Sequence, residues 1–326
     1  MRILVTGGAG FIGSHLVENL LAAGDKVDII DNFNDYYNPQ IKRENISKSL
    51  TDKNCLLLEG DICDRSFLAD VFTRHEYELV IHLAAMAGVR PSLEKPLLYS
   101  DVNIGGTQNL LEECRKKQIK KFILASSSSV YGNNTSLPFN ENDPVDTPIS
   151  PYAATKKAAE LICHTYHHLY DISLICLRFF TVYGPRQRPD LAIHKFARFI
   201  SQGKTLKLYG DGSTARDYTY IDDIISGIRG AVRYVKSNHC YEVINLGESK
   251  TINLLDMVNI LAEEMGKDVS KEFVPIQAGD VQITYADISK ARKLIGYDPK
   301  TDFREGIRKF LVWYNENNKM RYVEER

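Results

Sequence analysis

The sequence predicts an α/β protein built on a doubly wound parallel sheet, followed by a smaller mixed α/β substrate domain toward the C-terminal end. Apolar runs of strand length alternate with stretches of helical periodicity over residues 1–180. A glycine-rich segment separates the first apolar run from the first helical stretch, and an acid ends the second apolar run. Strand, glycine turn, helix, strand and acid together are the parts of a Rossmann dinucleotide-binding unit.

The first 31 residues contain this unit. Strands are expected at residues 3–6 and 27–30, with a helix that starts near Phe11 between them. Asp31 lies at the carboxyl end of the second strand, where its carboxylate can accept hydrogen bonds from the adenosine ribose hydroxyls. A carboxylate there would repel the 2'-phosphate of NADP, so the predicted cofactor is NAD.

The glycine turn fits two spacings that make the same physical demand. Both need a tight turn and a backbone bare enough to approach a pyrophosphate. One spacing is G-x-G-x-x-G, with Gly8, Gly10 and Gly13, and the other is G-x-x-G-x-x-G, with Gly7, Gly10 and Gly13. The unpaired N–H groups at the start of the helix, at Phe11 and Ile12, would face the phosphates.

Composition excludes several classes of protein. The chain has 326 residues, 44% of them hydrophobic, and a formal net charge of -1, so no basic excess is present to follow a nucleic acid. No apolar run approaches the ~20 residues that span a bilayer, and the N-terminus enters a strand without room for a signal peptide. The six cysteines are scattered without metal-ligand spacing, so no metal site is predicted. We expect a cytoplasmic protein without a nucleic-acid or membrane partner.

A third strand is expected from residue 55, and Asp61 and Ile62 follow it as candidate cofactor contacts. Asp61 either meets the adenine amino group or caps the helix that begins at Arg65, and the sequence leaves both interpretations open. The stretch before it, residues 32–54, is polar and is expected to be a surface loop with at most a short helix, beside the adenosine end.

The fourth strand, residues 78–85, contains His82, which we interpret as a core residue with satisfied hydrogen bonds. Residues 86–96 are expected to form a loop beyond this strand, where open parallel sheets bind ligands. Arg90 in that loop either contacts a phosphate or the substrate or is simply solvated. A long helix is expected over residues 98–117, and its glycine pair, Gly105 and Gly106, indicates close approach of backbone or cofactor.

The fifth strand, residues 120–132, breaks into four consecutive serines before Val-Tyr-Gly. Flexible linkers can be serine-rich, but a linker would not interrupt an apolar strand and then resume with apolar residues. We therefore expect hydroxyl groups at the edge of the sheet, about where a ligand would lie.

Tyr152 and Lys156 open the next expected helix, residues 152–170. Residues four apart lie on one helical face, so the phenol and the ammonium stand side by side. A free tyrosine titrates near ~10, and an adjacent ammonium favours the phenolate. The pair is therefore a candidate general base with its electrostatic partner.

Taken together, these motifs resemble the extended short-chain dehydrogenase/reductase family and, within it, the nucleotide-sugar 4-epimerases. The shared motifs are TGGAGFIG, Asp31, HLAA, the serine cluster, Tyr152 with Lys156, and Arg216-Asp217. The resemblance is strongest to the UDP-glucuronate 4-epimerases, through AAMAGVRPSLEKP, SPYAATKKAAEL, FFTVYGPRQRPD and RDYTYIDD. It implies an NAD-binding domain over residues 1–180, to which the chain returns around 218–248, and a mainly UDP-sugar-binding domain over residues 181–326.

The resemblance also implies a mechanism. Tyr152 takes the proton of the sugar 4-hydroxyl while hydride passes from C4 to NAD⁺, and the 4-keto sugar takes the hydride back on its other face. Lys156 lowers the pKa of the phenol and holds the nicotinamide ribose. Ser127 hydrogen-bonds the 4-oxygen and relays the proton, with Ser126 and Ser128 left open as alternatives.

The serine cluster distinguishes the predicted 4-epimerase from other enzymes of the family. Family dehydratases carry an Asp-Glu pair before Val-Tyr-Gly and decarboxylases carry a Glu, whereas this chain has Ser128 and Ser129. Elimination then lacks its general acid, so an NDP-sugar dehydratase or decarboxylase is the weaker alternative. A non-catalytic NAD-sensing protein is weaker still, because it would need neither Tyr152 nor Lys156.

The resemblance assigns the remaining substrate contacts. Thr181 and Arg188 would hold the sugar carboxylate, for which an arginine fork is suited; Arg188 paired with Asp190, or solvated, is the alternative. The other expected contacts of the UDP-sugar are Arg90, Ser127, Ser128, Arg186, Arg216 at the diphosphate and Asp280 near the nucleotide.

The predicted reaction interconverts UDP-glucuronate and UDP-galacturonate, in polysaccharide biosynthesis. UDP-glucose/UDP-galactose or their N-acetyl forms are the alternative substrates. Residues 99–117 and 152–170 resemble the helices with which family members form a four-helix dimer interface, so a homodimer is expected.

Overall fold

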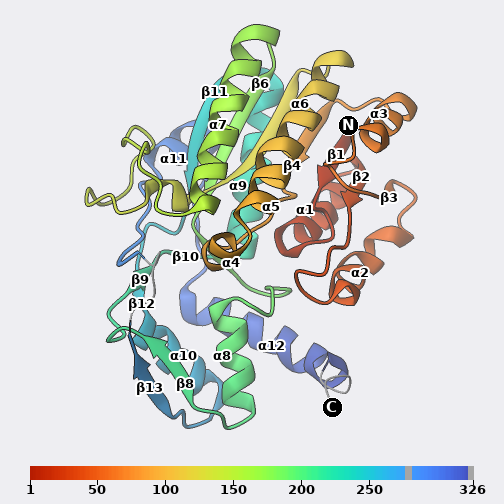
Figure 1. The fold of residues 1–326 in the computed structure, drawn as a ribbon. Helices are drawn as coiled ribbons and strands as arrows, with labels where there is room; N and C mark the ends of the chain where they lie inside the picture. Colours follow the sequence, from red (N-terminus) through yellow and green to blue (C-terminus); the bar gives the residue numbers. More distant parts are fainter. Residues whose placement is uncertain (276–280, 322–326) are drawn as a thin grey trace.

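The computed structural model describes residues 1–275 and 281–321. A central sheet with helices on both faces lies above a smaller lobe of short strands and helices (Figure 1). The predicted α/β class and the parallel sheet are confirmed.

All seven strands of the central sheet are parallel, in the order β3-β2-β1-β4-β5-β6-β11. The chain order reverses between β1 and β4, and in such sheets the ligand crevice opens at the carboxyl ends of the strands on either side of that point. The strands are β1 (Arg2–Thr6), β2 (Lys26–Asp31), β3 (Cys55–Glu59), β4 (Leu79–His82), β5 (Lys121–Ser127), β6 (Ser173–Phe179) and β11 (Tyr241–Leu246).

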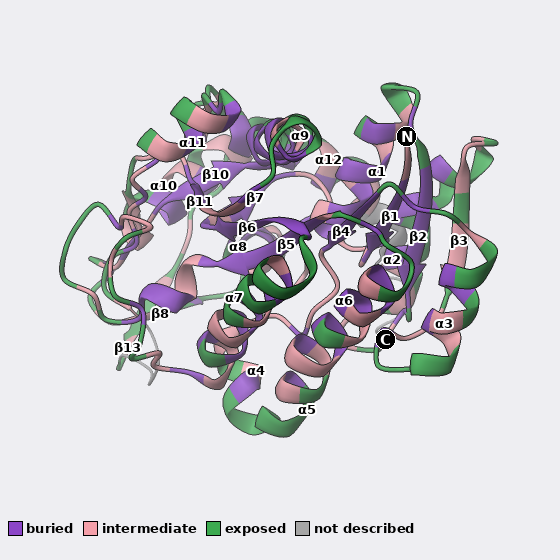
Figure 2. Cartoon of the chain, turned by 90° about the horizontal axis from the view of Figure 1, so that it is seen from above, coloured by how far each residue is buried: buried purple, intermediate pink, exposed green. Residues whose placement is uncertain are grey.

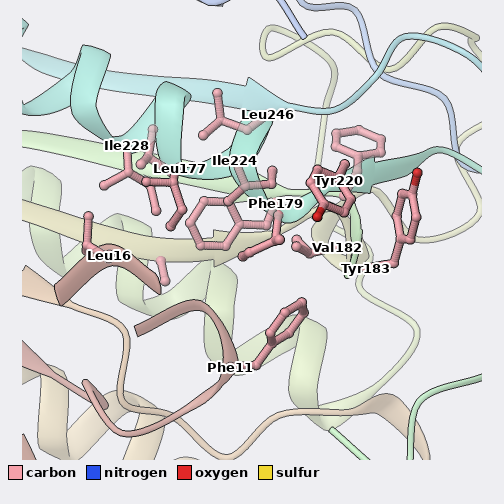
Figure 3. Packing of buried hydrophobic residues seen from close by; sticks show 14 of the residues in the cluster. Phe11, Leu16, Leu177, Phe179, Val182, Tyr183, Tyr220, Ile224, Ile228 and Leu246 are labelled. Atoms are coloured by element: carbon pink, nitrogen blue, oxygen red, sulfur yellow. The ribbon is translucent and has the colours of Figure 1, made fainter. Parts of the chain in front are cut away.

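Helices bury both faces of this sheet (Figure 2). One face packs against α1 (Phe11–Ala22) and α9 (Ile221–Ser237), and the other against α3 (Arg65–Arg74), α6 (Thr107–Lys116) and α7 (Pro151–Tyr170). Figure 3 shows Leu16 of α1, Leu177 of β6 and Ile228 of α9 meeting in the first of these layers. Because both faces are covered, the strands are apolar almost throughout.

The smaller lobe is mixed, with three two-stranded ladders. β7 (Thr181–Tyr183) pairs with β10 (Tyr218–Tyr220), β8 (Leu206–Tyr209) with β13 (Lys271–Val274), and β9 (Ala215–Arg216) with β12 (Ile252–Asn253). Its helices are α8 (Ala192–Ser201), α10 (Leu254–Met265) and α12 (Phe303–Arg321), while α11 (Ser289–Ile295) packs beside α9. Within the described residues, no helix has the length and apolarity that crossing a membrane requires.

Two sequence-based interpretations are wrong. Residues 86–96, expected as a loop, contain α4 (Val89–Glu94), and α5 (Pro96–Ser100) follows directly. Asp61 does not cap the next helix: Asp64 does, because its carboxylate accepts hydrogen bonds from the N–H groups of Ser66 and Phe67 at 2.9 and 3.0 Å. The polar stretch after β2 holds α2 (Pro39–Ser47) and a short 3-10 helix (Ser49–Thr51).

The long helix expected over residues 98–117 is divided. A π-helical segment (Asp101–Gly106) joins α5 to α6. The close approach predicted for the glycine pair holds at Gly106, where a Cβ atom would lie 2.5 Å from Cδ1 of Ile62. The neighbour is thus another part of the chain, and it is Ile62 that lines the cavity described below.

His82 is buried in β4 with both ring nitrogens bonded, as predicted. Nδ1 lies 2.7 Å from Oγ1 of Thr6, and Nε2 lies 3.0 Å from Oγ1 of Thr107. Burial lowers the pKa of the imidazole to about 3, and the nearby ammonium of Lys156 acts in the same direction. The ring is therefore neutral in the folded protein.

This burial makes the fold acid-sensitive. Below the ordinary histidine pKa of 6.5 the unfolded chain binds a proton at residue 82 that the folded chain does not. The free energy of unfolding should therefore fall by about 1.4 kcal/mol per pH unit from this group as pH drops toward 3. Urea unfolding of the protein and of His82→Gln over this pH range should show a shallower pH slope in the variant; equal slopes would contradict the assignment.

Candidate active site

One cavity of about 410 Å³ opens at the carboxyl ends of β1, β2, β4, β5 and β6. It brings the predicted cofactor residues and most of the predicted catalytic and substrate residues together. The cofactor residues are Gly7, Gly10, Phe11, Ile12, Gly13, Asp31, Asp61, Ile62 and Lys156, and the others are Ser127, Ser128, Tyr152, Thr181 and Arg188.

The glycine turn forms one wall of this cavity, and the spacing that begins with Gly7 describes it. Gly7 has a φ of 70°, and a Cβ atom there would lie 2.7 Å from the backbone nitrogen of Ala84. A Cβ atom on Gly13 would overlap the carbonyl oxygen of Gly7, so the turn and α1 can close only without side chains. Gly8 faces Ile29 of the sheet instead.

The end of the cavity near β2 is polar. The buried carboxylate of Asp31 accepts hydrogen bonds from the N–H groups of Ala9 and Phe33, at 3.2 and 3.0 Å. Burial nevertheless raises the pKa of Asp31, while the nearby ammonium of Lys42 opposes that change. A carboxylate placed here at the end of the second strand suits the hydroxyls of a ribose.

Lys156 joins α7 to the end of β5. Its Nζ donates a hydrogen bond to the carbonyl oxygen of Ala125 at 2.8 Å and lies 6.0 Å from the ring centroid of Tyr152. Burial lowers the pKa of Lys156 to about 8, and the carboxylate of Glu160 acts to raise it. The ammonium is therefore still mostly protonated at neutral pH.

Tyr152 and Ser127 line the same cavity. Burial raises the pKa of the phenol, whereas the hydroxyl of Ser127 and the charge of Arg188 lower it. Ser127 Oγ accepts a hydrogen bond from the N–H of Ser129 at 3.1 Å, so its own proton remains available for donation. That Lys156 also lowers this pKa stays a prediction; its ammonium bonds to the carbonyl oxygen of Ala125 and lies 6.0 Å from the ring centroid of Tyr152.

Of the three candidate serines, the geometry favours Ser127. Ser126 donates its hydroxyl proton to Glu160 instead, behind the strand end. Glu160 also receives two hydrogen bonds from Arg178, both at 2.9 Å, and the two side chains are almost fully buried. The sequence analysis missed this pair, although the spacing of Glu160 four residues after Lys156 on one helical face was a signal.

Arg188 lines the cavity and also pairs with Asp190. Its Nε and Nη2 donate to the two carboxylate oxygens at 3.0 and 2.8 Å, and its guanidinium lies 5.2 Å from the ring centroid of Tyr36. The pairing that the sequence analysis kept as an alternative therefore occurs in a side chain that still faces the cavity.

The loop that carries Arg188 is fastened to α1. Arg186, with a φ of 63°, pairs with Glu18 of α1 at 2.6 Å. His15 of α1 donates from Nε2 to the carbonyl oxygen of Pro185 at 3.0 Å, since a carbonyl can only accept. The predicted substrate contact at Arg186 thus faces the helix rather than the cavity.

Two further predicted arginines lie outside the cavity lining. Arg90 stacks 4.7 Å from the ring centroid of Tyr209. Arg216 donates from Nη1 to the carbonyl oxygen of Ala215 at 2.9 Å. Asp280 lies outside the described residues.

The sequence analysis placed residues 32–54 beside the adenosine end only, and so missed several cavity residues. Asn34, Tyr36, Tyr37 and Lys42 also line the cavity, and Tyr36 reaches the side chain of Arg188. Two adjacent tyrosines in a loop directly after the acid at a strand end were the available signal.

A glycine turn at the reversal of a parallel sheet, with a tyrosine, a lysine and a serine converging at the next strand ends, defines a dinucleotide-binding enzyme of the short-chain dehydrogenase/reductase type. The profile of the family described as GDP-mannose 4,6 dehydratase matches residues 4–310. The chain belongs to this family, within the extended short-chain dehydrogenases/reductases.

Its relatives include nucleotide-sugar epimerases. The chain is 44% identical to a UDP-glucuronate 4-epimerase of Thermodesulfobacterium geofontis, over 96% of each chain. It is similar to the structure of UDP-glucuronic acid 4-epimerase from Bacillus cereus in complex with UDP-glucuronic acid and NAD, with a TM-score of 0.90, 39% identity and coverage of 97% and 99%. It is also similar to UDP-glucose 4-epimerase from Thermotoga maritima with UDP-glucose, with a TM-score of 0.89, 33% identity and the same coverage.

The effect of Ser127 on the pKa of Tyr152 gives a testable pH dependence. Ser127→Ala removes the group that most lowers the pKa of the phenol, so the pKa of Tyr152 should rise. The rising limb of the pH–rate profile should then move to higher pH, and turnover at neutral pH should fall about a hundredfold. Ser129→Ala, which keeps the backbone N–H that binds Ser127, is the matched control; an unshifted profile in Ser127→Ala would exclude this serine.

Proposed function

We propose that the protein is an NAD-dependent 4-epimerase that interconverts UDP-glucuronate and UDP-galacturonate. The observation that carries this proposal is that one cavity brings together the glycine turn, Tyr152 with Ser127, and Arg188. The relatives named for the same reaction, and the solved complex of one of them with UDP-glucuronic acid and NAD, support it.

The cavity wall fits NAD. Gly7, Gly10 and Gly13 let the turn close tightly before α1, where backbone N–H groups suit a pyrophosphate, and Asp31 at the end of β2 suits the adenosine ribose. Asp61 and Ile62 line the same end, and Lys156 lies toward the strand end that carries Ser127. When bound, NAD supplies a reversible hydride acceptor for C4 of the sugar.

Side chains of the protein transfer the proton of the sugar 4-hydroxyl. Tyr152 removes the proton from the 4-hydroxyl as C4 is oxidised, and it returns the proton when C4 is reduced on its other face. Ser127 bonds both the phenol and the sugar 4-oxygen, so that it relays the proton along a short path. Lys156 holds the nicotinamide ribose and keeps a positive charge beside the base at neutral pH.

The serines at the end of β5 disfavour a reaction that eliminates water from the sugar. Ser128 and Ser129 line the cavity at the positions where, by resemblance, dehydratases and decarboxylases place carboxyl groups. Without such a group a 4-keto hexose has no general acid to expel its C6 hydroxyl as water, and a uronate, whose C6 is a carboxylate, has no hydroxyl there to lose. Inversion at C4 is then the remaining outcome.

Arg188 and Thr181 are the proposed contacts of the sugar carboxylate, because both line the cavity and a guanidinium binds a carboxylate with two parallel bonds. A neutral hexose is the second candidate, since Asp190 already uses one edge of Arg188 and a similar structure contains UDP-glucose. Arg90, Arg186 and Arg216 do not line the cavity; like Asp280, which lies outside the described residues, they stay proposed contacts of the UDP-sugar.

We also propose that residues 1–180, together with 218–248, bind the dinucleotide and that the remainder binds the UDP-sugar. This division is supported by β11, which is a strand of the central sheet, and by α9, which packs against that sheet.

We further propose a cytoplasmic homodimer that serves polysaccharide biosynthesis. Six free cysteines suit a reducing compartment. Leu161 and Leu169, eight positions apart on α7, are 55% and 63% exposed, as is suited to a helix-to-helix interface. Sedimentation of the protein and of Leu161→Glu tests the dimer, which the charge should dissociate.

The reaction is tested by incubating the purified protein with a panel of UDP-sugars without added NAD and identifying the products by NMR. Inversion at C4 of UDP-glucuronate is expected, whereas loss of water or of CO₂ from the substrate would contradict the proposal. Tyr152→Phe should abolish turnover and retain NAD, because the ring remains and only the base is lost.

Arg188→Ala tests the sugar. We expect kcat/KM for UDP-glucuronate to fall about a hundredfold, because the carboxylate loses its charged partner, and that for UDP-glucose to change less than about threefold. Equal losses on both substrates would favour the neutral-hexose alternative.

A further inference from the structure

The guanidinium of Arg188 is restrained on one edge and on one face. Asp190 accepts hydrogen bonds from Nε and Nη2, which fixes the side-on edge, and the ring of Tyr36 lies against the plane. An arginine side chain otherwise has several rotatable bonds and much conformational freedom to lose on binding. In this protein the two contacts orient it before any ligand arrives.

One edge of the guanidinium remains. The group carries five N–H donors in a fixed fork, and Asp190 takes one on Nε and one on Nη2. Among the residues that the structure describes, none accepts a hydrogen bond from Nη1. The end-on edge, formed by Nη1 and the second N–H of Nη2, is therefore the edge left for a carboxylate.

Burial and charge place the guanidinium of Arg188 in the cavity, on the side of the pair away from solvent. The side chain of Arg188 is 17% exposed while that of Asp190 is 39% exposed, so the acid lies on the solvent side of the pair. Arg188 lines the cavity with Tyr152, and its charge acts on the phenol.

Tyr36 is itself held in place. Tyr99 lies beside it and donates a hydrogen bond from its hydroxyl to the carbonyl oxygen of Ala87 at 2.8 Å. The ring of Tyr99 in turn meets that of Tyr152 edge to face, with centroids 6.2 Å apart. The residues beside the guanidinium of Arg188 thus connect, through Tyr99, to the proposed base Tyr152 on α7.

We infer that Asp190 is a positioning residue that sets the specificity of the enzyme for an acidic sugar: it holds the side-on edge of Arg188 so that the end-on edge meets the sugar carboxylate. This inference rests on the proposed function. It goes beyond the carboxylate contact itself, because the acid touches only the arginine.

The opposite role makes the opposite prediction. If Asp190 merely occupied Arg188 in competition with the substrate, its removal would free a positive charge and tighten the binding of UDP-glucuronate. The sign of the change therefore separates the two roles.

The experiment compares the NAD-loaded protein with Asp190→Ala and Asp190→Asn by titration calorimetry. Three ligands are used: UDP-glucuronate, UDP-glucose and UDP. We expect the affinity for UDP-glucuronate to fall about tenfold in Asp190→Ala and less in Asp190→Asn, which keeps one acceptor, while UDP-glucose and UDP bind as in the parent protein. Unchanged UDP binding shows that each variant is folded.

Two controls sharpen the result. Asp70→Ala breaks an exposed aspartate–arginine pair of the same length outside the cavity lining, with Arg74, and should change nothing. In the Arg188→Ala background, Asp190→Ala should have no further effect, because a residue that acts only through Arg188 has nothing left to position.

Tighter or unchanged binding of UDP-glucuronate in Asp190→Ala would overturn the inference, as would an undiminished effect without Arg188. Failure of the proposed function has a different signature: the parent protein would then bind UDP-glucuronate no better than UDP-glucose, or would not invert it at C4.

Discussion

The buried hydrogen bond from Lys156 to the carbonyl oxygen of Ala125 sets the geometry on which the rest of the site depends. Ala125 lies two residues before Ser127 at the end of β5, and Lys156 lies one helical turn after Tyr152 on α7. The bond therefore fixes the helix against the strand at the height at which phenol and serine meet. Because an ammonium is costly to bury, its retention here requires this acceptor and the nearby carboxylate of Glu160.

A second buried charge pair, Glu160 with Arg178, lies next to this contact. Glu160 binds Arg178 of β6 through two hydrogen bonds and also accepts one from Ser126. These bonds join α7 to β5 and β6 next to the strand end that carries the serines. Removal of either partner would leave an uncompensated charge in the interior.

Local spacing explains what the sequence alone could predict. The glycine turn, Asp31 and the pair of Tyr152 and Lys156 follow from strand, turn and helix periodicities that a few residues define. The parallel sheet then brings their strand ends to one edge without further information.

What the sequence did not reveal depends on how distant segments meet. Tyr36 and Arg188 are far apart in the chain, and only the packing of the loops after β2 and β7 brings them together. Arg186 and Arg188 look equivalent in the sequence, but the positive φ of Arg186 turns its side chain to Glu18. Asp61 and Asp64 were likewise distinguishable only once the start of α3 was known.

The fastening of the Arg188 loop to α1 has a consequence for altering the enzyme. His15 and Glu18 do not line the cavity, yet they anchor the segment that carries Arg188. Directed evolution confined to the cavity wall would leave these two anchors untouched. Variation of residues 15 and 18 would alter the substrate preference by shifting the whole loop that carries Arg188. It would also disturb α1, the helix at whose start the dinucleotide is proposed to bind.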